Sequence, residues 1–117
     1  MTDAEVGALD RLIETVAAGR ATYADFRIAP FDRCMSGEYT LAVNANHGDM
    51  NAAKSLHDAM IPDLRAVISE VTGRGRWVAW MWDESNARHF EAFADDPARA
   101  WLLSILRAYR AHIGGDT

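Results

Sequence analysis

The stretch RWVAWMWDESNARHFEAF, residues 76–93, carries the clearest structural signal in the chain. Three of the four tryptophans fall within its first half, and aromatic residues are enriched in β-strands. The polar triplet ESN at 84–86 is typical of a turn, and RHFEAFA then resembles a returning strand. The sequence therefore predicts a β-hairpin with strands at about 76–82 and 88–94.

The pairing register of this hairpin determines which side chains share a face, because side chains alternate along a strand. Pairing Trp82 with Arg88 places Trp80 opposite Phe90 on a nearly apolar face, which we expect to be core. An odd shift of register would mix the two faces. The other face is mixed in character and is the candidate interface: Trp77, Met81, His89, Glu91 and Phe93.

Two helices are expected before the hairpin. Thr2 and Glu5 have the spacing of a capping box, and apolar residues at helical spacing follow, so a helix should cover about 3–18. Asp49 is a candidate N-cap for a second helix over about 49–61.

The intervening segment, 20–46, has no clean period. It allows a short helical turn at 23–28 and a brief strand in EYTLAV, 38–43. The sequence allows this segment either to cover the second face of the sheet or to lie elsewhere. After the second helix, β-branched residues predict a strand over about 64–71, and GRG at 73–75 predicts a turn into the hairpin.

The last helix, over about 97–113, has Asp96 as N-cap, Pro97 at its first position and Gly114 beyond its end. Apolar residues cover one broad face of it. On the opposite face lie arginines, which we expect to point outside: Arg99, Arg107 and Arg110. The order of elements predicts one α+β domain, residues 1–117, with a three-stranded antiparallel sheet packed against helices.

Composition restricts the class of protein. The net charge of −5 and pI near 5.2 argue against direct binding to the phosphates of nucleic acid. Cys34 is the sole cysteine, which excludes an intramolecular disulfide and a multi-cysteine zinc site. The N-terminus lacks the pattern of a secretory signal, and no apolar run is long enough for a membrane span. We therefore expect no membrane association and a cytoplasmic location.

No catalytic or metal-binding motif stands out. His89 and Glu91 are two residues apart on one strand face, a spacing that metal sites use, but a third ligand is needed. The other histidines cannot be positioned from sequence: His47, His57 and His112. The acidic pairs Asp83-Glu84 and Asp95-Asp96 are explained by a turn and a helix cap. We therefore expect no cofactor, no bound metal and no catalytic residue.

The surplus of aromatic residues favours a binding surface. A sheet covered on one side leaves a face on which Trp77, Met81 and Phe93 form a natural protein interface, with Arg65 at its rim. Self-association is the simplest use of such a face. Single-stranded nucleic acid could also stack there, but the surrounding charge is wrong for its backbone.

Two segments, GDMNAAKSLHDAMIP at 48–62 and ADDPARAWLLSILRAYRA at 94–111, carry a resemblance. Together with the tryptophan-bearing hairpin, they resemble small hypothetical proteins of bacteriophages and prophages of alphaproteobacteria, over about residues 40–111, and the phage α/β sandwich domain. Where that family often has Pro-Gly-Trp after the helix, this chain has Pro62-Asp63-Leu64. The matching residues cap helices or fill cores, so the resemblance implies phage origin and no functional residue.

Phage origin favours a non-enzymatic binding protein that inhibits a host protein machine, as anti-CRISPR and other counter-defence proteins do. Its partner would be a host or phage protein in the host cytoplasm. The alternative is a self-associating structural or assembly accessory protein, for example a homodimer. A small metal-dependent enzyme built on His89 and Glu91 is the third hypothesis.

Overall fold

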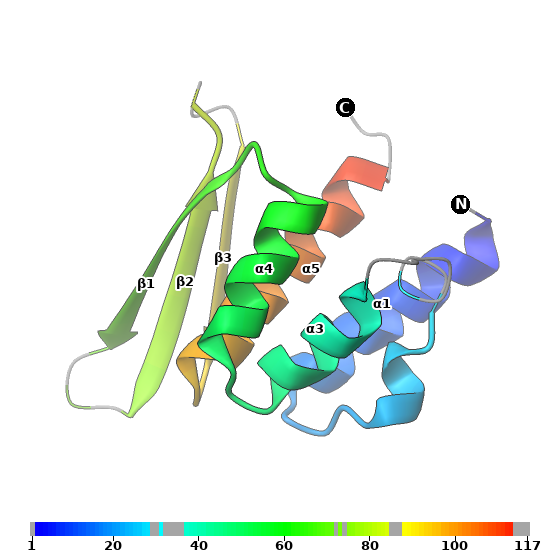
Figure 1. Ribbon diagram of the computed structural model, residues 1–117, viewed down its shortest axis with the longest axis horizontal. Helices are drawn as coiled ribbons and strands as arrows, with labels where there is room; N and C mark the ends of the chain where they lie inside the picture. Colours follow the sequence, from blue (N-terminus) through cyan, green and yellow to red (C-terminus); the bar gives the residue numbers. More distant parts are fainter. Residues whose placement is uncertain are drawn as a thin grey trace.

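A three-stranded antiparallel sheet lies on one side of the molecule and the helices lie on the other (Figure 1). The computed structural model describes residues 2–28, 31, 37–71, 73, 75–84 and 88–113 of the 117-residue chain. In chain order the elements are α1 (Asp3–Ala17), the 3₁₀ helix η1 (Tyr23–Phe26), α3 (Glu38–Asn46), α4 (Met50–Met60), β1 (Arg65–Val71), β2 (Arg76–Trp82), β3 (His89–Ala94) and α5 (Pro97–Ile113). The predicted α+β class is confirmed.

Local capping signals explain where the long helices begin. Thr2 N–H donates to Glu5 Oε1 at 2.9 Å and Glu5 N–H donates to Thr2 Oγ1 at 3.1 Å, which completes the predicted capping box. Asp49 and Asp96 each accept the backbone N–H of the third residue beyond them at 3.0 Å. The predicted terminator Gly114 lies outside the described residues, as does Cys34.

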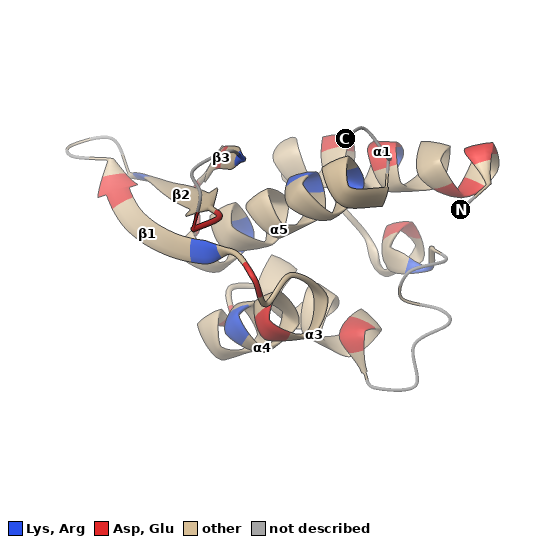
Figure 2. Ribbon diagram, turned by 90° about the horizontal axis from the view of Figure 1, so that it is seen from above, with Lys and Arg blue, Asp and Glu red and all other residues tan. Residues whose placement is uncertain are grey.

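The central element is α5, which contacts all three strands and also α1, α3 and α4. Figure 2 shows it running between the sheet and the other helices. Because α5 has neighbours on several sides, its buried positions go round the helix: Ala98, Ala100, Leu102, Leu103, Ser104, Ile105, Leu106 and Ala108. This exceeds the single apolar face that the sequence predicts.

The prediction that the arginines of α5 point outside is wrong. Arg99, Arg107 and Arg110 are all half-buried. Arg99 Nη2 donates to the backbone oxygen of Asn46 at 3.2 Å, and Arg110 Nε donates to a carboxylate oxygen on α1 at 2.8 Å. Their long apolar stems lie along the packed surface while their charged ends reach polar groups of neighbouring elements.

The segment 38–43 is not a strand but the first part of α3. Its buried side chains Ala42, Val43 and Ala45 belong to the main core, and α3 packs against α4 and α5. Tertiary contacts therefore outweigh the β-forming composition of EYTLAV. The helical turn predicted at 23–28 is confirmed by η1.

The face of the sheet that meets the helices is lined by small residues. Ala79, Ala92 and Ala94 are buried there, with 0%, 0% and 6% of their surfaces exposed. Opposite them, α5 presents Ala100, which is also buried and packs with Ala79 and Ala94. Short side chains on both elements let the helix lie close to the strands, so this side of the sheet is filled by the protein itself.

Candidate functional site: the outer face of the sheet

The register of the hairpin differs by one residue from the predicted one. Trp82 pairs with His89 rather than with Arg88, and Trp80 pairs with Glu91. The connection explains the difference: Asp83 N–H donates to Arg88 O at 3.4 Å, and Arg88 Nε lies 3.2 Å from Asp83 Oδ2. Arg88 therefore lies opposite Asp83 at the end of the loop. The next residues along the two strands, Trp82 and His89, form the first pair of the sheet. A shift of one residue moves every side chain of one strand to the other face.

The five residues of the predicted interface therefore do not share a face. Met81 points toward the helices and is 1% exposed, and Trp77 is half-buried against Ala79 and Ala94. His89, Glu91 and Phe93 lie on the opposite side of the sheet. The register prediction is wrong for the two β2 residues and places the β3 residues correctly on the side away from the helices.

The side chains on the side away from the helices form what we call the outer face. Its principal residues are Val67 from β1, Trp80 and Trp82 from β2, and His89, Glu91 and Phe93 from β3. Val78, which pairs with Phe93, lies on the same side but is only 3% exposed. Three of its apolar residues are strongly exposed: Val67 at 46%, Trp80 at 41% and Phe93 at 42%. None of the helices in the described ranges lies over this face (Figures 1 and 2).

Val67, Trp80 and Trp82 are the residues of this face that sequence reasoning missed. The alternating pattern assigns Trp80 to the core because it assumes the other register. The signal that identifies the correct register is the opposite charge of Asp83 and Arg88, which pair across the turn. The observed register also places Val67 on the outer face, because Val67 of β1 pairs with Trp80 of β2.

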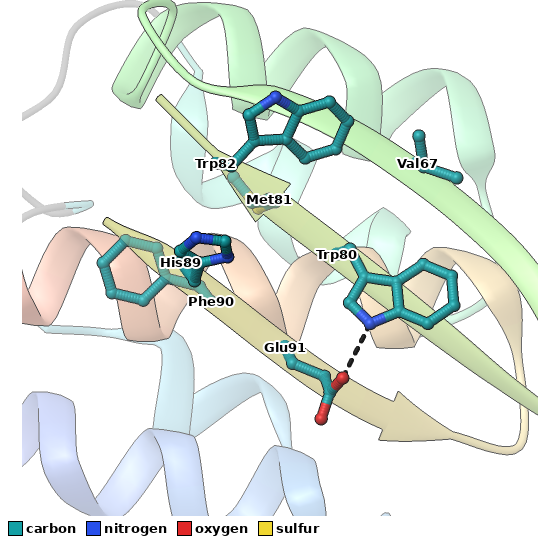
Figure 3. Close-up of a pocket in the computed structure, with 7 residues that line it drawn as sticks. All are labelled: Val67, Trp80, Met81, Trp82, His89, Phe90 and Glu91. Atoms are coloured by element: carbon teal, nitrogen blue, oxygen red, sulfur yellow. Dashed lines mark hydrogen bonds between the residues drawn. The ribbon is translucent and has the colours of Figure 1, made fainter. Parts of the chain in front are cut away.

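A hollow of about 590 Å³ lies in this face (Figure 3). Such a volume falls within the range of known ligand sites, about 300–1,000 Å³. Its walls come from all three strands: Val67, Trp80, Met81, Trp82, His89, Phe90 and Glu91. In Figure 3, Trp80 leans from β2 toward Glu91 on β3.

One hydrogen bond holds the aromatic surface in place. Trp80 Nε1 donates to Glu91 Oε2 at 2.6 Å. The same glutamate accepts Arg107 Nη1 on its backbone oxygen at 2.9 Å, which ties β3 to α5. The indole ring is thereby fixed before any partner arrives, so less conformational entropy is lost on binding.

Ion pairs surround the end of the hairpin next to the hollow. Arg65 donates to Glu84 through Nε at 3.0 Å and also through Nη2. Asp83 and Arg88 form the second pair. Both pairs give the outer face a polar border, and the exposed Arg65–Glu84 pair contributes little to stability by itself.

The histidines do not assemble a metal site. His57 is buried between α4 and α5, and His47 is exposed at the end of α3 with its ring 5.9 Å from that of Tyr23. His112 is exposed near the end of α5. Among the residues whose structure is described, no three His, Cys, Asp or Glu side chains are grouped so as to hold a metal ion.

The fold and the outer face define an α+β domain in which the helices of the described residues cover one side of the sheet. Comparisons with protein-family models, curated proteins and solved structures find no match for this chain. The resemblance to phage proteins thus stays a prediction. In the described part of the chain, no helix has the length and apolar character needed to cross a membrane.

Proposed function

We propose that this chain is a non-enzymatic protein-binding domain that engages a partner protein through the outer face of its sheet. The observation that carries the proposal is the exposure of Val67, Trp80 and Phe93 on one face that the helices in the described ranges leave uncovered. Exposed apolar patches with polar borders mark interaction sites more often than other parts of a protein surface.

The chemistry of the face supports a protein partner. Tryptophan is among the residues that contribute most to binding energy at protein interfaces, especially when surrounded by residues that exclude water. Trp80 and Trp82 stand at the centre of the outer face, while the Arg65–Glu84 pair lies at its border. An apolar centre with a polar border is the usual organisation of such interfaces.

The negative charge of the chain favours a basic partner protein. The chain carries a net charge of −5, and Glu91 places a carboxylate within the hollow itself. A partner with basic residues around an apolar patch would be attracted to this surface, and its association would be faster at low salt. The same charge disfavours the phosphate backbone of a nucleic acid.

The finer form of the proposal is that the partner is a host protein machine and that binding inhibits it, as in counter-defence by a bacteriophage protein. This form rests on the resemblance to phage proteins and on the acidic charge. It predicts a single stoichiometric partner in the cytoplasm of the host bacterium.

Site-specific photo-crosslinking tests the proposal. The photoreactive residue p-benzoylphenylalanine is placed at Phe93 on the outer face and, as a matched control, at the exposed Asn51 on α4. In a lysate of the source cells, we expect one protein to be captured from position 93 and not from position 51. Capture should fall when Trp80→Ser is introduced into the protein that carries the photoreactive residue at position 93.

Equal capture from both positions, or capture unaffected by Trp80→Ser, would contradict binding through the outer face. Thermal melts of each variant accompany the experiment, because a loss of capture counts only where the variant remains folded. Trp80 is 41% exposed, so its replacement is expected to leave the fold intact.

A further inference from the structure

The two edges of the sheet are not equivalent. The strand order is β1-β2-β3, so β1 and β3 are the edge strands. On β3, the backbone oxygen of Glu91 is occupied by Arg107 of α5. On β1, none of the described groups hydrogen-bonds the outward side of the strand. Figure 1 shows β1 at the border of the sheet, opposite to β3.

The outward groups of β1 follow from the ladder. Asp83 N–H donates to Arg88 O, so this pair is hydrogen-bonded and every second pair after it is too. The pair of Trp80 with Glu91 is then not hydrogen-bonded, which agrees with Glu91 O facing α5. Trp80 must therefore direct its backbone groups to Val67 on β1. The residues of β1 that direct N–H and C=O groups away from the sheet are the alternate ones: Ala66, Ile68 and Glu70.

This edge carries only part of the protection that exposed edges have in other proteins. Natural edge strands carry proline, charged side chains, inward-pointing charges or a bulge, or are covered by another element. The two charged residues of β1, Arg65 and Glu70, stand near its two ends, with Glu70 on the helix side, and the residues between them are uncharged. The strand RAVISEV, residues 65–71, has no proline or lysine and pairs with β2 without a bulge. Its β-branched residues favour extended structure. A strand of this kind is a template for pairing with another strand.

We propose that β1 pairs antiparallel with β1 of a second copy of this chain, about a two-fold axis at Ile68. Ile68 is the midpoint of 65–71, so this register pairs the whole strand. It places the outward-directed Ala66 and Glu70 opposite one another, and both strands then satisfy their unpaired backbone groups. The two sheets join into one continuous sheet.

The side chains of β1 are compatible with this self-pairing. Ile68, half-buried on the helix side, meets its own counterpart, and Val67 lies opposite Ser69. Val67 also lies diagonally across from the second copy's Val67, which reduces its exposure of 46%. Arg65 faces Val71 and Glu70 faces Ala66, so no like charges oppose each other.

The pairing goes beyond the proposed binding function and keeps the outer face available. An axis perpendicular to the sheet leaves the outer faces of both copies on the same side, where they form one surface. A two-strand contact buries less area than a standard interface of about 1,600 Å², so a weak, concentration-dependent dimer is expected. Each copy carries a net charge of −5, so added salt should strengthen the association.

Sedimentation equilibrium of the full chain over a range of concentrations tests the proposal. Glu70→Pro removes an outward N–H but no hydrogen bond between β1 and β2, whereas Glu70→Ala keeps that N–H and serves as the matched control. We expect a wild-type dimer whose dissociation constant rises at least about tenfold in Glu70→Pro and is unchanged in Glu70→Ala.

A third variant separates pairing through the edge from pairing through the outer face. Trp80→Ser should leave the dimer intact. A wild type that is monomeric at the highest attainable concentration overturns the proposal. So does a dimer that survives Glu70→Pro, or one that Trp80→Ser abolishes while Glu70→Pro does not.

Amide hydrogen exchange of the wild type keeps the test decisive if Glu70→Pro fails to fold. The amides of Ala66, Ile68 and Glu70 should be protected at concentrations where the dimer forms and should exchange faster on dilution. The amide of Val67, which bonds within the monomer, should change much less. Equal exchange of Ile68 at both concentrations overturns the proposal.

Discussion

Trp101 Nε1 on α5 donates a hydrogen bond of 3.1 Å to Nδ1 of His57 on α4. On the other side of the ring, His57 Nε2 lies 2.7 Å from the backbone oxygen of Leu64, just before β1. An indole N–H can only donate, so Nδ1 accepts, and Nε2 must carry the proton that reaches Leu64. This buried imidazole joins two helices to the start of the sheet, and the histidine is therefore a structural residue rather than a metal ligand.

A double-mutant cycle measures this link. His57→Leu leaves both the Trp101 N–H and the Leu64 oxygen without a partner, and Trp101→Phe leaves His57 Nδ1 without a donor. Each unsatisfied buried group costs about 1–3 kcal/mol. We expect the double variant to lose less stability than the sum of the single variants, in urea unfolding of all four proteins. Additivity to within about 0.5 kcal/mol would show that the two residues are not coupled.

The register of the hairpin predicts opposite results at adjacent positions. Met81 is 1% exposed and Trp80 is 41% exposed. Met81→Ala should therefore lower the free energy of unfolding by about 2–5 kcal/mol. Trp80→Ala removes a larger side chain, but from the surface, and should cost about 1 kcal/mol or less. Chemical denaturation of the two variants checks this, and the reverse order would support the pairing of Trp82 with Arg88.

Gly48 stands where two helix starts meet. Its φ is +100°, and a Cβ atom there would lie 3.1 Å from Asp96 Oδ2, whose carboxylate caps α5. Gly19 has a φ of +72°, and a Cβ atom added there would have no other atom within 4 Å. Gly19→Ala is therefore the matched control. Both substitutions should cost about 1–2 kcal/mol in backbone strain.

Gly48→Ala should cost more than Gly19→Ala, because it also disturbs the cap of α5, by up to about 1 kcal/mol. Thermal and urea unfolding of the two variants provide the comparison. Equal losses would mean that the Asp96 carboxylate can move aside without weakening the helix.

Lys54 and Asp58 form an ion pair one helical turn apart on α4. Lys54 Nζ donates to Asp58 Oδ2 at 2.8 Å, and this hydrogen bond lowers the pKa of Asp58. Because the folded-state pKa lies below the unfolded one, the pair stabilises the fold above the unfolded-state pKa. That contribution is lost as the pH falls through the folded-state pKa.

Lys54→Met should therefore raise the pKa of Asp58 toward its ordinary value, measured by titration of the carboxyl carbon in NMR spectra. Both side chains are strongly exposed, so added salt should reduce the difference between the variant and the wild type. A pKa that is unchanged by Lys54→Met would show that the lysine does not act on Asp58.

The caps of the helices could be predicted because their signals are local. Thr2 and Glu5, Asp49, and Asp96 with Pro97 each define a helix start within four residues, and the structure confirms all three. The α+β class follows from the order of these helices and the aromatic hairpin. A local signal does not depend on the rest of the chain, so the sequence alone is enough for it.

The site is harder to predict because its identity depends on pairing. His89, Glu91 and Phe93 belong to the outer face under the observed register, and the alternation along β3 groups them correctly. Trp77 and Met81 do not belong with them, because the Asp83–Arg88 closure shifts the pairing by one residue. No periodicity within either strand contains that information.

From the amino-acid order alone come the helix starts, the hairpin and the amphipathic pattern, since each arises from interactions between near neighbours in the chain. Packing in three dimensions settles the rest: α3 in place of a strand, the burial of α5 on several sides, and the exposure of Trp80 instead of Trp77. These depend on contacts between distant segments, and a shift of one residue in strand pairing exchanges the core face and the outer face of the sheet.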